Sequence, residues 1–312
     1  MKRSEKLRDR FLGCLLGMAI GDALGMPAEG MSREQIRQKF GILEDFHPAR
    51  GLPAGSYTDD TQMSLIIAQS LVEHRRFCPE DIAGRFARWR DYAVGPGRAC
   101  WEAATRLACG VPWREAGIPS AGCGSAMRVA PLGLFHYCRR GELKKDAVTS
   151  SVITHTDSRA CAGAAAVAFA VSYCLTAAES GFSQEYFIRE TAEFVEDLNY
   201  KMAERIKMIL PLLSLEEEEG LARLGTGGFV LETVPAAFYC FLKHIHSFRD
   251  ALVAAVNAGG DTDSIGAICG AIAGAYHGAG KIPLVWKDRV QDRDKILETA
   301  DALYNLVPAA GN

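Results

Sequence analysis

The chain has 312 residues, of which 48% are hydrophobic and 23% are charged, a composition typical of a folded globular protein rather than a disordered one. The formal net charge of −3 excludes the strongly basic surface with which proteins bind nucleic acids or anionic membranes. We therefore expect no sequence-specific nucleic-acid binding. No linker-like composition or internal repeat divides the chain, so the sequence predicts a single domain over residues 1–312.

The cysteines point to a reducing compartment. All ten are scattered along the chain, and none forms a CxxC pair. This distribution is typical of reduced thiols packed as small hydrophobic groups, and not of a disulfide framework or a zinc site. We therefore predict a cytoplasmic protein.

Three apolar stretches have to be compared with membrane spans and export signals. Residues 1–23 combine a basic start with an apolar run, as a signal peptide does, but Glu5 and Asp9 interrupt the basic region. Residues 160–178 and 264–280 carry no formal charge and approach the length of a membrane span. Their Ala and Gly content favours buried core helices, so we expect no membrane association.

Apolar residues recur at helical spacing along nearly the whole chain, and strand-like alternation is nearly absent. An apolar face opposite a charged face is present in residues 62–74, 81–93, 186–198, 200–213, 248–258 and 294–307. This pattern predicts an all-α fold. Residues 159–178 are rich in Ala and apolar all round, which predicts a central helix buried on every side. The acidic stretch 214–228 is expected to be a solvated loop or helix end.

Polar side chains crowd the start of two apolar helices. The segment SYTDDTQMSLIIAQS, residues 56–70, opens with Thr58, Asp59, Asp60 and Thr61. One such residue is enough to cap a helix, and adjacent carboxylates repel each other unless a positive group lies near them. The segment GGDTDSIG, residues 259–266, repeats the surplus with Asp261 and Asp263.

These acidic clusters have two interpretations. Both can be helix N-caps whose charge is stabilised by the helix dipole. Alternatively they bind metal, because buried carboxylates need cationic partners and no Arg or Lys lies close to either cluster in sequence. Carboxylate and hydroxyl ligands suit Mg²⁺ or Mn²⁺ better than Zn²⁺, and several carboxylates at one point suggest two ions.

Five motifs span most of the chain. They are GMAIGDALGMPAEG (17–30), YTDDTQM (57–63), GCGSAMRVAPLGL (122–134), THTDSRACAGA (154–164) and GGDTDSIGAICGA (259–271). Together, and in this order, they resemble the motifs of the ADP-ribosylglycohydrolase family, and the combination of TDDT with GGDTDS is highly specific. The resemblance implies an all-α hydrolase that binds ADP-ribose or an ADP-ribosylated acceptor and uses two Mg²⁺ ions, or Mn²⁺, as cofactors.

Carried over position by position, the resemblance also implies a ligand set. One ion would be bound by Thr58, Asp59, Asp60 and Asp263, and the other by Asp261, Asp263 and Ser264. Relatives often have Thr where this chain has Ser264, so the hydroxyl ligand is retained. Glu29 matches the family's mobile glutamate, which acts as a gate and as an acid/base residue. Asp59 or Asp60 would orient the attacking water.

The resemblance further implies a substrate-binding loop and a histidine. The implied substrate contacts are Gly122, Cys123, Gly124, Ser125, Met127, Arg128 and His155. Glycines let backbone N–H groups approach a phosphate closely, so this loop would cradle the diphosphate and the distal ribose. Relatives commonly have Asn at the position of Cys123, which leaves the preferred acceptor open. Cys123 as a nucleophile, Arg128 in a structural ion pair and His155 as a structural residue are the alternatives.

Hydrolysis of the glycosidic bond between ADP-ribose and an acceptor is the leading prediction, and the acceptor stays open between a protein side chain, a base and a small molecule. The alternative within the fold is a hydrolase of free derivatives such as O-acyl-ADP-ribose. A non-catalytic ADP-ribose-binding protein and a metal-dependent phosphohydrolase are further alternatives. A monomer is the default expectation.

Overall fold

The computed structural model of the protein describes residues 4–307 and confirms the all-α prediction. Within these residues the chain forms α-helices and short 3₁₀ helices, and extended backbone pairing is limited to isolated bridges such as Gly122 with Phe229. One continuous cluster of buried apolar side chains contacts helices from both ends of the chain. The prediction of a single domain over residues 1–312 stays a prediction, and this continuous core supports it.

The helix bounds are as follows. The first half holds α1 (Glu5–Gly25), η1 (Met26–Ala28), α2 (Arg33–Phe40), α3 (Asp59–His74), α4 (Pro79–Trp89), η2 (Arg90–Tyr92), α5 (Arg98–Ala108), α6 (Trp113–Ala116), η3 (Cys123–Ser125), α7 (Ala130–Phe135) and α8 (Arg140–Val152). The second half holds α9 (Ser158–Ser180), α10 (Gln184–Val195), α11 (Tyr200–Lys207), α12 (Ile209–Leu212), α13 (Glu217–Leu224), α14 (Val230–Lys243), α15 (Phe248–Val256), α16 (Thr262–His277), η4 (Ala279–Lys281), α17 (Leu284–Lys287) and α18 (Arg293–Leu306).

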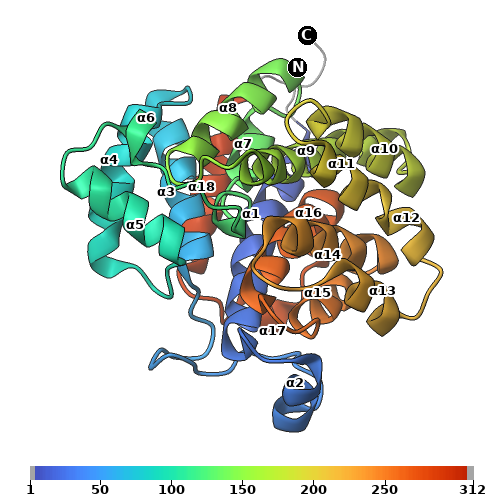
Figure 1. The fold of residues 1–312 in the computed structure, drawn as a ribbon. Coiled ribbons are helices and arrows are strands. Elements are labelled where there is room, and N and C mark those ends of the chain that lie inside the picture. The colour runs from blue at the N-terminus through green and yellow to red at the C-terminus, as the bar shows by residue number, and fades with distance from the viewer. Residues whose placement is uncertain (1–3, 308–312) are drawn as a thin grey trace.

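Helices α1 and α16 lie against each other in the middle of the molecule and run in opposite directions (Figure 1). Glycines recur at every fourth position on the shared face, at Gly13, Gly17, Gly21 and Gly25 of α1 and at Gly266, Gly270 and Gly274 of α16. Residues four apart share one face of a helix, and small residues there let two backbones approach closely. The two helices therefore meet backbone to backbone.

The contact between these helices leaves no room for a side chain. A Cβ added to Gly13 would lie 2.5 Å from the carbonyl oxygen of Gly274, and each of the other six glycines would also bring a Cβ within 3.0 Å of the opposite backbone. At the end of the contact the Thr262 hydroxyl donates a hydrogen bond of 2.8 Å to the carbonyl of Gly25. The end of α1 is thus fixed against the beginning of α16.

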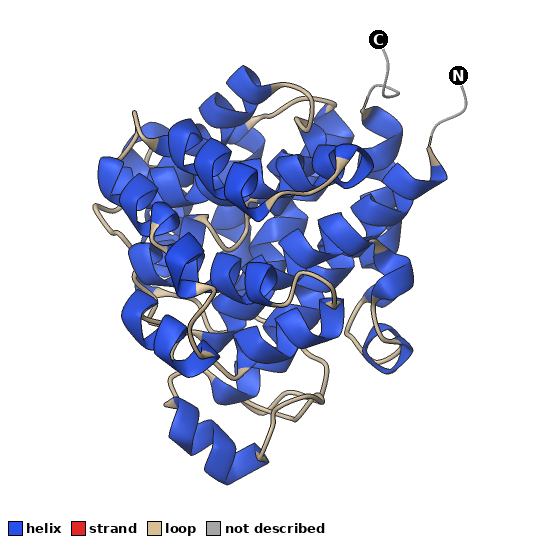
Figure 2. Ribbon diagram, turned by 90° about the vertical axis from the view of Figure 1, so that its right-hand side faces the viewer, coloured by secondary structure: helices blue, strands red, loops and turns tan. Residues whose placement is uncertain are grey.

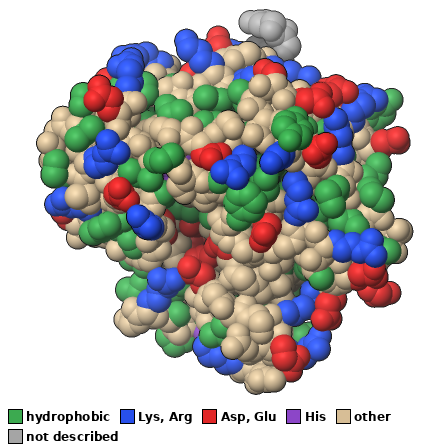
Figure 3. Space-filling view, viewed as in Figure 1, with side chains coloured by type: hydrophobic (Ala, Val, Ile, Leu, Met, Phe, Trp, Pro, Cys, Tyr) green, Lys and Arg blue, Asp and Glu red, His purple; other side chains and the backbone are tan. Residues whose placement is uncertain are grey.

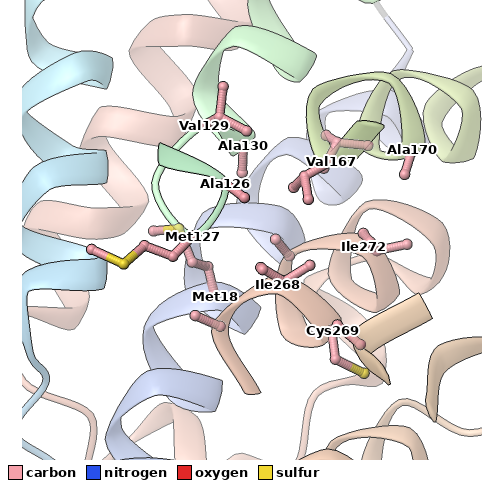
Figure 4. Close-up of a cluster of buried hydrophobic side chains, with 14 of the residues drawn as sticks. Met18, Ala126, Met127, Val129, Ala130, Val167, Ala170, Ile268, Cys269 and Ile272 are labelled. Atoms are coloured by element: carbon pink, nitrogen blue, oxygen red, sulfur yellow. The ribbon is translucent and has the colours of Figure 1, made fainter. Parts of the chain in front are cut away.

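Helix α9 confirms the prediction of a buried Ala-rich helix, since residues 160–172 are all buried. It packs against α7, α8, α10, α14 and α16. Figure 4 shows part of the shared core, to which Met18 of α1, Met127, Val167 of α9 and Ile268 of α16 all contribute side chains. The small side chains of α9 let these neighbouring helices pack closely against it.

Two helical segments are long and apolar enough to cross a membrane, Glu5–Ala28 and Ser158–Ala177. Their apolar windows are 94% and 89% buried inside the protein, which is the environment of core helices. Helix α2, in contrast, projects from the rest of the protein on a long connection (Figure 2).

One predicted element differs from the structure, and a second is confirmed except at one residue. The single helical face expected over 200–213 is divided at Met208 into α11 and α12. Pro211 accounts for the break, because it has no N–H to bond to the carbonyl of Lys207 and its ring crowds that carbonyl. The acidic run of the stretch 214–228 lies at the start of α13, and Glu216, Glu218 and Glu219 are exposed, as predicted for a solvated helix end. Glu217 is only partly exposed and bonds to Arg33 and His244, at 2.9 Å and 2.7 Å.

The glycine contact yields a stability prediction. Gly17→Ala should lower the free energy of unfolding by about 1–3 kcal/mol, because the new methyl group overlaps the backbone of Gly270. Gly84→Ala is the matched control, since Gly84 lies inside α4 and its added Cβ would meet nothing closer than 3.8 Å. That control should be neutral or stabilising by up to about 1 kcal/mol. Urea unfolding of both variants measures the difference, and equal midpoints would refute the close contact.

Candidate metal and ligand-binding site

A cavity of about 520 Å³ opens between the N-termini of α3, α5 and α16 and the η3 loop. Acidic side chains are visible inside a hollow above the projecting α2 (Figure 3). The lining includes Glu29, Gly30, Asp59, Asp60, Gly95, Gly97, Arg98, Cys100, Ser120, Gly122, Cys123, Gly124, Met127, His155, Gly227, Gly228, Gly260, Asp261, Asp263 and Ser264. The two acidic clusters predicted from the sequence therefore meet in one place, although some 200 residues separate them in the chain.

Asp22 fastens α3 to the central helix pair. It is the single formally charged residue in the apolar run 11–28, which spans most of α1 and all of η1, and it is completely buried. Its carboxylate accepts hydrogen bonds from the backbone N–H of Thr58 at 2.9 Å, from the N–H of Thr61 at 3.0 Å and from the Thr61 hydroxyl at 2.6 Å. The start of α3 is thus held at a fixed place beside α1.

Asp59 and Asp60 occupy the first turn of α3, but neither is its cap. The N-cap is Thr58, whose hydroxyl oxygen lies 3.4 Å from the N–H of Asp60. The Asp59 carboxylate accepts a backbone hydrogen bond from Gly97 at the start of α5. Asp60 is 2% exposed, and its Oδ2 has no hydrogen-bond partner. A buried carboxylate oxygen without a donor is costly unless a cation faces it.

The capping interpretation also fails for Asp261. This residue lies at the N-cap position of α16, yet its side chain makes no capping hydrogen bond. Its Oδ2 instead lies 2.9 Å from the thiol of Cys123. Two residues further, Asp263 accepts a hydrogen bond of 3.0 Å from the N–H of Ser264. Both carboxylates line the cavity and leave oxygen atoms available for a ligand.

Glu29 approaches this cluster from the loop that follows α1. Ligand atoms of Glu29, Asp261 and Asp263 all lie within 4.8 Å of one another. On its other side Glu29 forms an ion pair with Arg50, which has a left-handed backbone conformation with φ of 53°. Burial and the nearby charge of Asp263 raise the pKa of Glu29 to about 7, and Arg50 opposes that rise. Glu29 can therefore hold or release a proton near neutral pH.

The electrostatics of the cavity show a deficit of positive charge. Burial, followed by the charge of a neighbouring carboxylate, raises the pKa of Asp263 to about 8 and those of Asp59 and Asp60 well above the usual range. Burial raises the pKa of Asp22 to about 6, and the hydrogen bonds from Thr61 and Thr58 oppose that rise. Within residues 4–307, no Lys or Arg forms an ion pair with the four aspartates that line the cavity, although Arg98 lies in its lining and Arg50 pairs with Glu29. These carboxylates, together with the unpartnered Asp60 oxygen, fit a site for divalent cations with oxygen ligands.

The glycine loop forms the opposite wall of the cavity. Gly122 pairs with Phe229 in a short antiparallel bridge, and the N–H of Cys123 donates 3.0 Å to the carbonyl of Gly228. A Cβ on Gly124 would lie 2.7 Å from the Cys100 sulfur and 2.8 Å from the ring of His155, so this position requires glycine. At its glycines the wall brings backbone close to the cavity, as an anion-binding loop does, and the side chains of Cys123, Met127 and His155 line the rest.

His155 faces the same wall with a neutral ring. Burial lowers the pKa of His155 to about 3. Its Nδ1 lies 2.8 Å from the hydroxyl of Thr154, and that hydroxyl accepts a hydrogen bond of 2.8 Å from Arg128. Nε2 lies on the cavity side, near Gly122. His155 thus offers a ligand an uncharged imidazole nitrogen.

Comparisons with known proteins agree with this geometry. The sequence profile described as ADP-ribosylglycohydrolase matches residues 3–312. The chain belongs to the ADP-ribosylglycohydrolase family. It is 31% identical to the ADP-ribosylhydrolase ARH3 of Gallus gallus over 98% of this chain and 95% of that protein. It is 30% identical to the ADP-ribosylarginine hydrolase Tri1 of Pseudomonas putida, with 97% and 80% covered.

A solved structure, an "ADP-ribosylglycohydrolase-related protein complex", has the same fold with a TM-score of 0.80 and 30% identity over 98% of this chain and all of that one. A protein of Archaeoglobus fulgidus without an assigned function is 40% identical over 96% of this chain and 97% of its own length. The family and the hydrolases among these relatives identify the chain as a hydrolase of the glycosidic bonds of ADP-ribose.

Most residues that the sequence analysis assigned to the site of this glycohydrolase line the cavity. Thr58, Ser125 and Arg128 lie behind the lining, at 0%, 1% and 0% exposure. The Ser125 hydroxyl donates to the carbonyl of Ala160, and the Arg128 guanidinium to two carbonyls and to Thr154. Arg128 therefore supports the wall through hydrogen bonds. The structural role expected from the sequence was an ion pair.

Sequence reasoning missed two groups that complete the glycohydrolase site, Asp22 and Arg50. A detectable signal existed for Asp22, because a lone charge in a long apolar run needs buried donors. No pattern marks Arg50, whose position depends on the conformation of the loop between α2 and α3. The glycines at 95, 97, 227 and 228, which also line the cavity, lie in loops and were not assigned either.

The raised pKa values predict how the stability of the metal-free enzyme depends on pH. The folded pKa values of Asp22, Glu29 and Asp263, about 6, 7 and 8, exceed the unfolded values of about 4. The folded chain then binds more protons than the unfolded chain, so stability should fall as pH rises from about 4 to 8. Melting curves in a chelator at pH 5 and pH 8 measure this loss.

Added Mg²⁺ should raise the melting temperature more at pH 8 than at pH 5, because the ion binds the folded carboxylates in place of protons. A melting temperature of the chelated enzyme that rises from pH 5 to pH 8 would contradict the assigned charge deficit.

Proposed function

We propose that the enzyme is a Mg²⁺-dependent hydrolase that cleaves the glycosidic bond between ADP-ribose and an acceptor at a site for two ions. The observation that carries this proposal is the convergence of Asp59, Asp60, Asp261 and Asp263 around a buried carboxylate oxygen that has no donor. Mn²⁺ accepts the same oxygen ligands and can replace Mg²⁺.

The ligand set proposed from the family motifs divides into two groups. Thr58, Asp59, Asp60 and Asp263 would hold one ion, and Asp261, Asp263 and Ser264 the other. When bound, the ions supply positive charge that binds ribose hydroxyls and lowers the pKa of water. Asp60 supports this assignment best because its Oδ2 lacks a partner, while Thr58 would act from behind the lining.

Glu29 is the proposed acid/base residue. With a pKa near 7 it can take a proton from water and return one to the leaving group. It lies at the edge of the acidic cluster, and Arg50 holds the opposite side of its carboxylate. Asp59 or Asp60, which line the same cavity, would orient the attacking water.

The neutral wall of the cavity is the proposed binding surface for the rest of ADP-ribose. Gly122, Cys123, Gly124 and Met127 line it, and the backbone there faces the ligand. A diphosphate carries negative charge, so it cannot lie against the carboxylates and is expected at the glycine loop and His155. Ser125 and Arg128 contribute by keeping this loop in place.

The acceptor and the linkage stay open. The named relatives include an ADP-ribosylarginine hydrolase, which supports a modified side chain as substrate, and hydrolysis of a free derivative such as O-acyl-ADP-ribose is the alternative. All four aspartates of the cluster are present, which argues against a non-catalytic binding protein. Membership of the glycohydrolase family argues against a phosphohydrolase. We also propose that the protein is a cytoplasmic monomer that binds neither membranes nor specific nucleic-acid sequences.

A panel of ADP-ribosylated acceptors, assayed with and without chelator, tests the function. We expect release of ADP-ribose that stops on chelation and returns with Mg²⁺ or Mn²⁺. Asp263→Asn should abolish turnover and lower Mg²⁺ affinity, whereas Asp294→Asn, whose carboxylate is 86% exposed on α18, should change neither. Chelator-resistant activity, or release of inorganic phosphate in place of ADP-ribose, would overturn the proposal.

Glu29→Gln tests the acid/base role separately. The amide cannot transfer the proton, so turnover should fall by about 100-fold or more while Mg²⁺ binding, measured by calorimetry, stays within about twofold. Glu34→Gln is the control, because Glu34 is exposed in the adjacent helix α2 and does not line the cavity. Equal rates for both variants would remove Glu29 from the mechanism.

A further inference from the structure

Cys123 places a sulfur atom inside a cluster of oxygen ligands. Its Sγ lies 2.9 Å from Oδ2 of Asp261 and 3.6 Å from Oγ of Ser264. The side chain is buried at 9% exposure and lines the cavity together with both of these residues. The thiol therefore faces two of the three residues proposed to hold the second ion.

These separations fit common ligation of one ion. Ligands about 2.0–2.3 Å from the same metal are about 3.0–3.6 Å apart for angles between right-angled and tetrahedral. The observed separations of 2.9 Å and 3.6 Å lie close to this range. A second observation points to a cation in the same cavity, namely the buried Oδ2 of Asp60 that has no hydrogen-bond partner.

The backbone holds the thiol in this position. The N–H of Cys123 bonds to the carbonyl of Gly228 at 3.0 Å, and the N–H of Asp261 bonds to the carbonyl of Thr226 at 2.8 Å. One short segment, residues 226–228, therefore anchors the backbone of both Cys123 and Asp261. The two side chains start from positions that the backbone fixes relative to each other.

Other buried cysteines near the cavity face different groups. The sulfur of Cys100 lies 3.7 Å from the guanidinium of Arg128, and that of Cys161 lies 3.9 Å from the carbonyl of His155. Hydrogen bonds to carbonyls or cations keep these thiols away from the carboxylates. The contact of Cys123 with the acidic cluster is therefore a property of its own position and not of buried thiols in general.

We propose that Cys123 is a sulfur ligand at the second ion position, so that this site binds thiophilic divalent cations such as Co²⁺, Zn²⁺ and Cd²⁺ more tightly than an all-oxygen site would. The inference rests on the metal site of the proposed function. On binding, the S–H bond breaks, a sulfur–metal bond forms and the proton leaves to solvent. Soft thiolate ligands favour these ions over Mg²⁺, so such ions compete with Mg²⁺ for the site.

The test is a Co²⁺ titration of the metal-free, full-length enzyme followed by absorption spectroscopy. Cys109→Ser and Cys138→Ser are introduced first, because these two cysteines are exposed and could bind Co²⁺ on the surface. In this background we expect a sulfur-to-cobalt charge-transfer band. Adding Cys123→Ser should remove the band, and adding Cys161→Ser, a buried control, should keep it.

Calorimetry supplies a second measurement. Cys123→Ser should weaken Cd²⁺ binding by about tenfold or more and change Mg²⁺ binding by less than about twofold, since the ions differ in their preference for sulfur. Circular dichroism checks that each variant is folded. Co²⁺ binding without the charge-transfer band, or an equal band in Cys123→Ser, overturns the role of Cys123 and leaves the metal site standing. Failure of Co²⁺, Mn²⁺ and Mg²⁺ all to bind overturns this inference and the proposed function together.

Discussion

The close contact of α1 and α16 is the constraint on which the site depends. Glycines on both helices let the backbones touch, and the contact ends where Gly25 meets Thr262. At that point α1 ends, the chain continues through η1 toward Glu29, and α16 begins with its carboxylates. Asp22, one turn earlier, attaches the start of α3 through three donors. The acidic groups are thus gathered by backbone packing, and their own repulsion does not decide where they lie.

The packing forces carboxylates together at an electrostatic cost that a metal-free chain must bear. Burial and mutual repulsion raise the pKa of Asp263 to about 8, which is far from the ordinary range for Asp. The opposite wall is neutral backbone with an uncharged His155. The two sides of the cavity therefore suit ligands of opposite charge. The acidic side suits cations, and the glycine side suits an anion such as a diphosphate. The helix dipoles of α3 and α16 add positive potential on the acidic side.

The sequence predicted much of the fold, because amphipathic periodicity marks a helix wherever one face is buried, and the buried α9 was recognised from its Ala content. The helical pattern over 200–213 did not predict the break between α11 and α12, because one residue, Pro211, interrupts the backbone hydrogen bonding there. For the site, surplus carboxylates at two helix starts were a sufficient signal for Asp59 and Asp261. The ion pair of Arg50 was beyond prediction, because it joins two loops whose conformations depend on the whole structure. Burial of Arg128 behind the wall likewise depends on tertiary packing.

The bond between Thr262 and Gly25 joins positions 237 residues apart in the chain. During synthesis on the ribosome, α1 is complete long before α16 exists, and its glycine face has nothing to cover it. Contacts between such distant segments form late and slow folding. The nascent chain therefore leaves this apolar glycine face uncovered until α16, in the last sixth of the sequence, has been synthesised.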